Sequence, residues 1–460
     1  MSASPDLGIP VLAGQCSWEE AARTGLSVEE NVRRLLRYHW VERQLFFAAI
    51  AHLPGTTEWE VKCALALHQY QDIEHAGTLR RRVGEMRSPA PRMDVAPDAA
   101  LEAWLEEALR ARDTVELLAG VYGVIRPALV AAYRRHMAET NPLVDHPTCR
   151  LLRWALIEEE EAIAWGERAL SALVERDAEA RARADAWQHH LQAYLAAAGG
   201  IAGDAERSGA ALPRARANRG AFVPDTRPRR DARFAEPHNF NFPPHVIYND
   251  PAIPPDERNL AQLCKRTLEM DVPEMMASFL AERTSEPLEF YLDYARQLWD
   301  EARHAMMGSA WFEARGVDWT RIPLNVGFAL RLSQHATPLE RQAVLYYIEQ
   351  GLMHGETGKR LEWQTALAAG DELSTLFHDY DWADEVLHAQ IGRRRMQADG
   401  LSSRDALALA ERVQQRTWNV LDGYRDRAPQ REWWRAFVRE VLGRESAASE
   451  EAVLGQPLTS

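Results

Sequence analysis

Hydrophobic residues recur every three to four positions over two long parts of the chain, residues 31–198 and 257–400. This spacing places apolar side chains on one face of an α-helix. Alternation with a period of two, which would indicate strands, is scarce. The pattern therefore predicts an all-α fold. Four long periodic segments follow one another in residues 257–400, which is typical of a four-helix bundle.

The helical pattern is interrupted by residues 199–256, which are rich in glycine, proline and arginine. This composition predicts an irregular linker between two domains, although its aromatic part, "HNFNFPPHVIYND", is expected to pack against a domain surface. We therefore expect an N-terminal tail (1–30), a first helical bundle (31–198), the linker (199–256), a second bundle (257–400), and a C-terminal helical extension and tail (401–460).

Composition and charge exclude several classes of protein. The 460 residues carry a formal net charge of -14, which argues against a nucleic-acid surface. The four cysteines are far apart with no C-x-x-C pair, so neither a disulfide framework nor a cysteine zinc site is expected. The N-terminus has no signal-peptide layout, and no long apolar run stands out. These features predict a cytoplasmic protein that does not enter a membrane.

One short motif occurs twice, as "DEARHA" at Asp300–Ala305 and "DEVLHA" at Asp384–Ala389. A single acid-x-x-His match is weak evidence, because composition alone predicts about two in this chain. The two copies, however, share four of six residues, and each lies in a long predicted helix about 30 residues after another acid. Two helix pairs with this spacing are what a carboxylate-bridged dinuclear metal site requires.

A Glu and a His three positions apart share one helical face. A dinuclear site in a bundle uses one Glu from each of two helices and a Glu-x-x-His pair from each of the other two. Hard carboxylates with only two imidazoles suit iron or manganese better than zinc. The predicted ligands are Glu269, Glu301, His304, Glu356, Glu385 and His388.

The first of these helices offers Glu269, Asp271 and Glu274 as ligands. Glu269 is preferred because it precedes Glu301 by 32 residues, which puts the two side chains level in an antiparallel helix pair. Pro273 cannot donate a hydrogen bond to the carbonyl of Glu269, so the helix either kinks there or begins only near Asp271. Asp271 and Glu274 therefore remain as alternatives.

The third helix offers two acids. Glu356 precedes Glu385 by 29 residues and is preferred because this spacing again puts the two side chains level in an antiparallel helix pair. Glu349 lies seven residues before Glu356 and therefore on nearly the same helical face. Both remain open.

The second half of the chain also matches the first half as an internal repeat. The segment "VERQLFFAAIAHL" pairs with "LEMDVPEMMASFL", and "QDIEHAG" pairs with "DEARHAM". The matched pairs are Glu42 with Glu269, Asp72 with Glu301, His75 with His304 and Glu159 with Glu385, whereas Ala162 faces His388 and Ala128 faces Glu356. Without a two-residue difference in the connecting turn, Glu42 would match Asp271 instead. We therefore expect the first half to be a degenerate copy that serves as scaffold or subunit contact.

The order Glu, Glu-x-x-His, Glu, Glu-x-x-His resembles the ferritin-like diiron carboxylate superfamily, fully over residues 257–400 and incompletely over the first half. The resemblance implies two tandem ferritin-like four-helix bundles. It also implies two iron ions, with manganese as the alternative at one or both positions. Glu301 and Glu385 would bridge the ions, Glu269 and Glu356 would be terminal ligands, and each ion would take one histidine.

The same resemblance implies an enzyme, a diiron oxidase or oxygenase that uses dioxygen to oxidise a small organic substrate. Its expected partners are the substrate, dioxygen, an electron-donor protein and other copies of the chain. No catalytic side chain beyond the metal ligands is assigned. A ferroxidase that handles iron itself is the alternative function, and a metal-free helical scaffold is the third.

Each ligand histidine should donate its second N–H to a fixed acceptor. Asp300 and Asp384 are the candidates. Neighbouring residues on a helix point about 100° apart. Each aspartate is therefore expected to serve the histidine of the other motif, or none.

Overall fold

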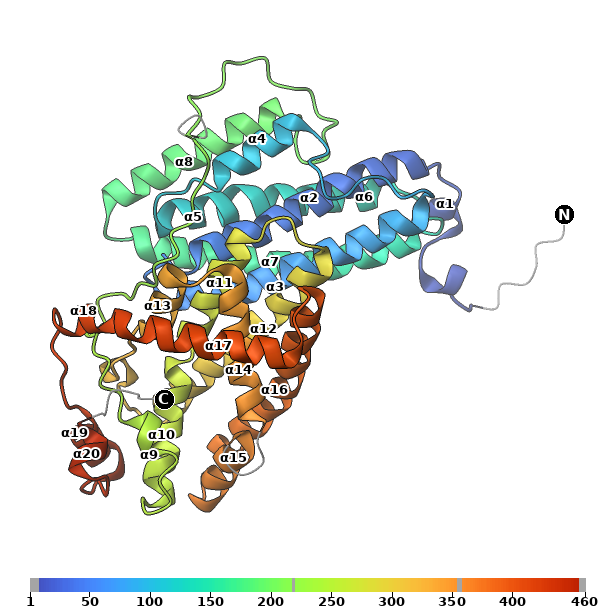
Figure 1. Cartoon of the computed structure of the whole chain (residues 1–460). Coiled ribbons are helices and arrows are strands. Elements are labelled where there is room, and N and C mark those ends of the chain that lie inside the picture. The colour runs from blue at the N-terminus through green and yellow to red at the C-terminus, as the bar shows by residue number, and fades with distance from the viewer. Residues whose placement is uncertain (1–7, 217–219, 354–357, 455–460) are drawn as a thin grey trace. The chain divides into compact units, whose positions relative to one another are not determined.

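The computed structural model describes residues 8–216, 220–353 and 358–454. These residues form helices joined by turns and irregular segments, with no strand among them (Figure 1). The all-α prediction is confirmed for this part of the chain. Spatial contacts divide the chain into unit 1, residues 1–48 and 71–223, and unit 2, residues 49–70 and 224–460. The division falls inside the predicted linker, but residues 49–70 group with unit 2, which the sequence pattern did not indicate.

Three long helices organise unit 1. They are α2 (Val28–His52), α3 (Trp59–Met86) and α7 (His146–Val174), and the first two continue at one end into residues 49–70. Shorter helices complete the unit: η1 (Leu12–Gly14), α1 (Trp18–Ala21), α4 (Ala99–Ala108), α5 (Thr114–Gly120), α6 (Arg126–Glu139) and α8 (Ala178–Ala197). The side chain of Asp113 caps the start of α5 by accepting the backbone N–H of Glu116.

A π-helical turn, η2 (Val121–Ile125), joins α5 to α6 and makes Thr114–Glu139 one continuous helical stretch. A π-turn accommodates one more residue than an α-turn and shifts the register of everything after it. This stretch is also long and apolar enough to cross a membrane, contrary to the expectation from sequence, but 78% of its most apolar window is buried inside the structure. Such burial is typical of the core helix of a soluble protein.

Unit 2 is built around α10 (Pro255–Leu268), α12 (Leu288–Glu313), α14 (Pro338–Leu352) and α16 (Glu372–Ala398). Helix α10 packs on α12, α12 on α16, and α16 on α14. The other elements are α9 (Pro244–Ile247), α11 (Asp271–Glu282), η4 (Trp319–Arg321), α13 (Gly327–His335), α15 (Lys359–Ala368), α17 (Ser403–Trp418), η5 (Asn419–Leu421), α18 (Asp422–Arg425), α19 (Trp434–Leu442) and α20 (Glu450–Val453).

The expected helix around Glu269 is broken into α10 and α11 at Glu269 and Met270. The break agrees with the expectation for Pro273, which lacks the N–H needed to continue the α10 ladder. Glu274, an alternative ligand, is turned into an ion cluster with Lys62 and Arg230. Asp271, the other alternative, accepts the backbone N–H groups of residues 328 and 329 at the start of α13.

The aromatic part of the predicted linker does pack, as expected. Within unit 2, the ring of Phe242 lies 5.7 Å from that of Trp433, whose indole N–H donates to the carbonyl of Asn241 at 2.9 Å. This segment also forms part of the wall of a cavity described below.

Candidate metal centre

Two of the three groups of potential metal ligands found among the described residues of unit 2 contain predicted ligands. One ligand atom from each member of a group lies within 4.8 Å of those of the others. The first group is Glu301, Glu349, Glu385 and His388, and the second is Glu269, His304 and Asp381. Five of the six predicted ligands therefore belong to these groups. The sixth, Glu356, lies outside the described residues.

Helices α12 and α16 present the two motifs to each other. Glu301 and His304 are on α12, Glu385 and His388 are on α16, and all four are at most 4% exposed. The imidazole rings lie 5.9 Å apart between centroids. The i, i+3 spacing on each helix puts the acid and histidine on the face that meets the partner helix, as the sequence predicts.

Each histidine is held by the aspartate of the other motif. Nε2 of His304 lies 3.1 Å from Oδ2 of Asp384, and Nε2 of His388 lies 3.3 Å from Oδ2 of Asp300. The predicted crossed pairing is therefore confirmed. With Nε2 donating to a carboxylate, Nδ1 is the atom that faces the cluster, which is how ligand histidines are usually oriented.

Glu301 reaches toward both histidines. Its Oε1 lies 3.3 Å from Nδ1 of His388, and its Oε2 lies 3.8 Å from Nδ1 of His304. Glu385 also contacts His388, at 3.2 Å. Burial lowers the pKa of His304, but the carboxylates of Asp381, Asp384 and Glu301 outweigh it and raise the pKa to about 9. The proton on its Nδ1 is therefore the one that a metal ion would replace.

Glu349 on α14 is the helix-three acid that the structure brings into the cluster. Gln297 donates to its Oε1 at 2.9 Å, while its buried Oε2 has no hydrogen-bond partner. Burial, together with the nearby Glu385, raises the pKa of Glu349 well above its usual value. An unpaired carboxylate oxygen in the core is costly unless a cation or proton neutralises it.

Asp381 is a potential ligand that the sequence reasoning missed. It is fully buried on α16 and lies 3.3 Å from Nδ1 of His304. A signal was present, since Asp381, Glu385 and His388 follow each other at i, i+4 and i+7 and so occupy one helical face. With Glu269 at the end of α10, Asp381 completes the second group.

Two buried cations inside the cluster were also missed. Nζ of Lys359 lies 2.9 Å from both oxygens of Asp381 and 2.9 Å from Oε1 of Glu385. Arg266 donates to Asp381 and to Glu269, each at 2.7 Å. Four buried carboxylates and the partly buried Glu269 therefore face two cations, an imbalance that divalent ions would correct. Besides Oε2 of Glu349, the inward Nδ1 of His304 also lacks a hydrogen-bond partner. The donor set therefore fits a pair of hard or borderline divalent ions.

Histidine and acid neighbours extend the cluster on one side. Glu362 and His378 form a further group with Asp381. The carboxylate of Glu362 is already taken by Lys265 and Arg266, each at 2.6 Å. This group is therefore less available to a metal ion.

A cavity of about 290 Å³ opens beside the cluster. Four of the carboxylates, Glu269, Glu301, Glu349 and Glu385, form part of its wall. The rest of the wall is mostly apolar and includes Phe242, Leu268, Phe328, Leu345, Ile348 and Trp418. Such a cavity can admit a small organic molecule next to bound ions.

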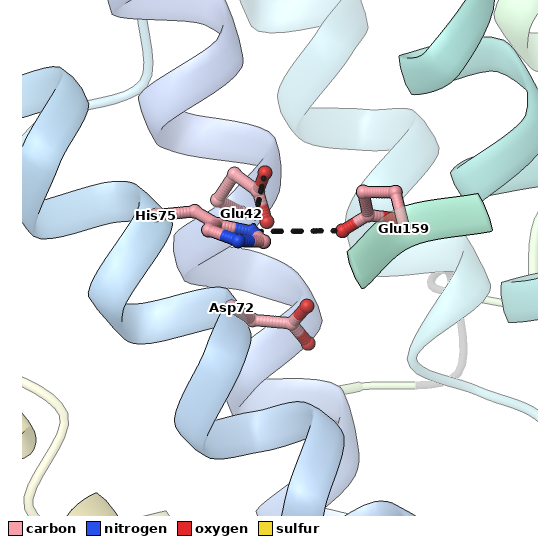
Figure 2. A group of neighbouring side chains, drawn as sticks. All are labelled: Glu42, Asp72, His75 and Glu159. Atoms are coloured by element: carbon pink, nitrogen blue, oxygen red, sulfur yellow. Dashed lines mark ion pairs between the residues drawn. The ribbon is translucent and has the colours of Figure 1, made fainter. Parts of the chain in front are cut away.

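The repeat-matched residues of unit 1 also come together. Glu42 from α2, Asp72 and His75 from α3, and Glu159 from α7 form one buried group (Figure 2). Arg126, which the sequence reasoning did not single out, donates to both oxygens of Asp72 and to Oε1 of Glu159 at 2.8–2.9 Å. A cation thus stands inside this cluster as well.

Comparison with known proteins identified no matching family model, no matching curated protein and no matching solved structure. The function is therefore argued from the geometry of the clusters.

Proposed function

We propose that unit 2 is a ferritin-like, four-helix diiron oxidase that uses dioxygen to oxidise a small organic substrate. The observation that carries the proposal is the meeting of five carboxylates and two inward-facing histidines from α10, α12, α14 and α16 beside an apolar cavity. Carboxylate-rich sets with two imidazoles and room for a further ligand are suited to iron, with manganese as the alternative.

The roles of the residues follow from their contacts. Glu301, with one oxygen toward each histidine, would bridge the two ions. Glu349 and His388 would be further ligands of one ion, and Glu269 and His304 would be further ligands of the other. Glu385 lies between His388 and Lys359 and is the second candidate bridge.

Asp300 and Asp384 would keep the histidines in the tautomer that presents Nδ1. The bound ions would supply the electrons that reduce dioxygen, and an electron-donor protein would restore the ferrous state. The cavity wall would orient the substrate and exclude water from the reaction.

The wall of the cavity also indicates which substrates fit. Arg331 is 2% exposed, lines the cavity and donates to the neutral acceptors Thr417 and Gln414. Burial lowers its pKa to about 10, a value at which it is still a cation at neutral pH. The charge of Asp271, which also lines the cavity, acts on this guanidinium, but the hydrogen bonds of the guanidinium go to neutral groups, and Lys265 and Arg425 add positive charge to the wall. This arrangement favours an anionic guest. The proposed substrate is therefore a largely apolar molecule with one anionic group.

The substrate class can be tested by ligand-induced thermal stabilisation. Octanoate is expected to raise the melting temperature of the metal-loaded protein and octanol to do so less, because only the former can pair with Arg331. The Arg331→Met variant should lose this difference. Equal stabilisation by both compounds in the wild type would contradict the anionic preference.

The diiron proposal is tested by loading the protein with ferrous iron without oxygen, measuring iron per chain by mass spectrometry and then admitting oxygen while following the visible spectrum. The wild type is expected to bind two irons in unit 2, measured as the difference in iron per chain from Glu385→Ala, and to show a transient oxygen-dependent band. Both should be lost in Glu385→Ala and kept in Glu372→Ala, an exposed acid at the start of the same helix. Continued oxidation of added ferrous iron into a mineral would favour the ferroxidase, and a unit 2 that retains no iron would favour the scaffold.

A further inference from the structure

The cluster in unit 1 contains three buried ligand atoms without hydrogen-bond partners. They are Oε2 of Glu42, Nδ1 of His75 and Oε2 of Glu159, all buried. Both glutamates are 0% exposed. Nδ1 of His75 lies 3.3 Å from Oε1 of Glu42 and 3.8 Å from Oε1 of Glu159, and dashed lines mark these ion pairs in Figure 2. Buried polar atoms of this kind are rare without a partner.

The orientation of His75 repeats that of His304 in unit 2. Its Nε2 lies 2.7 Å from Oε2 of Glu158, the neighbour of Glu159 on α7. Glu158 therefore has the same relation to His75 that Asp384, the neighbour of Glu385, has to His304. A carboxylate on the outer nitrogen leaves the inner one to bind a metal ion.

Arg126 takes the place of one ligand in unit 1, so the cluster there has room for only one metal ion. Its position is found by matching the third and fourth helices of the two units. In each unit a tyrosine of the third helix packs against a glycine of the fourth: Tyr122 against Gly166, and Tyr346 against Gly392. A side chain at either glycine would collide with that tyrosine.

Counting from these tyrosines gives the register of the third helix in each unit. Glu349 comes three residues after Tyr346, and Arg126 comes four after Tyr122. The π-helical turn Val121–Ile125 takes up the extra residue. Arg126 thus stands at the position of the acid Glu349. This match replaces the sequence-based pairing of Ala128 with Glu356 in this helix.

The guanidinium of Arg126 neutralises one side of the cluster. It binds Asp72 through both oxygens and Glu159 through Oε1. Tyr133 donates to Oε1 of Glu42 at 2.6 Å. The atoms that remain are the three unpartnered ones. Their side chains come from three different helices. Glu42, Asp72 and Glu159 are three carboxylates in this cluster, and the single positive charge of Arg126 does not balance them.

We propose that unit 1 binds one divalent first-row transition metal ion, Mn²⁺, Fe²⁺ or Zn²⁺, through Glu42, His75 and Glu159. The guanidinium of Arg126 supplies the positive charge that a second ion would otherwise provide. Two carboxylates and one imidazole suit these ions. The bound ion links α2, α3 and α7. Together with the two ions proposed for unit 2, the whole chain carries three ions.

The test removes the metal ligands of unit 2 by substitution and measures the metal that the variant chain still binds. The Glu301→Ala/Glu385→Ala double variant, loaded with Mn²⁺ and freed of excess metal, is expected to keep one Mn²⁺ per chain by mass spectrometry. Adding His75→Ala should reduce this to zero. Adding His189→Ala instead, an exposed histidine of the same unit, should leave it at one. No manganese in a double variant with native helical circular dichroism would overturn the proposal, as would retention after His75→Ala.

A second measurement covers a double variant that does not fold. In the otherwise native chain, His75→Ala should lower the bound metal by one ion relative to His189→Ala. This outcome is independent of the diiron proposal, because a unit 2 that binds no metal would leave a count of one in the wild type and none in His75→Ala. An unchanged count in His75→Ala would refute the site in unit 1 alone.

Discussion

The clusters of unit 1 and unit 2 place acids and a histidine on matching helical positions, but they balance the buried charge differently. In unit 1, Arg126 binds two of the carboxylates at once. In unit 2, the same position of the third helix is Glu349, an additional acid. The cations there, Lys359 and Arg266, come from other positions.

The two units therefore show two ways of placing positive charge beside a buried group of carboxylates. Buried carboxylates need positive charge nearby, whether from an ion or from a side chain. In unit 1, an arginine placed by a one-residue π-turn supplies part of this charge, at Asp72 and at one oxygen of Glu159.

Arg126→Leu is expected to have the largest effect, because it leaves Asp72 and Glu159 without their cation. Removing one partner of a buried ion cluster costs about 3–5 kcal/mol of unfolding free energy. Urea denaturation measures the change, with Arg134→Leu, an exposed arginine on α6, as the control. Excess Mn²⁺ should restore part of the stability. A loss below about 1 kcal/mol, the size of a surface ion pair, would contradict the role assigned to Arg126.

Lys359→Met tests whether the lysine side chain and bound metal ions neutralise the same carboxylates in unit 2. The metal-free variant is expected to lose about 3 kcal/mol, because Asp381 and Glu385 lose a buried partner. The metal-loaded variant should lose less, since bound ions stabilise the folded state. Arg360→Met, at the exposed neighbouring position, is the control. Equal losses with and without metal would show that Lys359 and the ions do not act on the same carboxylates.

Glu158→Gln and Asp384→Asn remove equivalent acceptors from His75 and His304. Each is expected to weaken metal binding in its own unit about 10–100-fold, because such partners orient ligand histidines. Metal titration monitored by isothermal calorimetry checks both variants. Glu161→Gln, exposed on α7, is the control. If only Asp384→Asn has an effect, the likeness of the two histidine positions does not extend to metal binding.

Tyr133→Phe should have the smallest effect. It removes the hydrogen bond to Glu42, and a bond to a charged acceptor contributes about 1.5–3 kcal/mol. The loss should lie at the lower end, near about 1.5 kcal/mol, and thermal unfolding measures it. The loss should shrink when metal is bound, because the ion then stabilises the same carboxylate. No change in the metal-free protein would mean that this bond adds nothing to the cluster.

The sequence by itself determined the features that depend on one helix at a time. Periodicity predicted the helices, and the i, i+3 spacing predicted that Glu301 and His304, and likewise Glu385 and His388, share a face. Pro273 predicted the break near Glu269. Each of these follows from backbone geometry within a few residues, so a single chain segment contains all the information.

The tertiary structure alone decided the features that depend on how helices meet. Glu349 joins the cluster because of the register of α14 against α16, and the one-residue π-turn in unit 1 places Arg126 at the matching position. Lys359 enters the cluster from the start of α15. Such positions depend on the height and rotation of one helix against another, which side-chain packing across the core sets and which spacing along the chain does not specify.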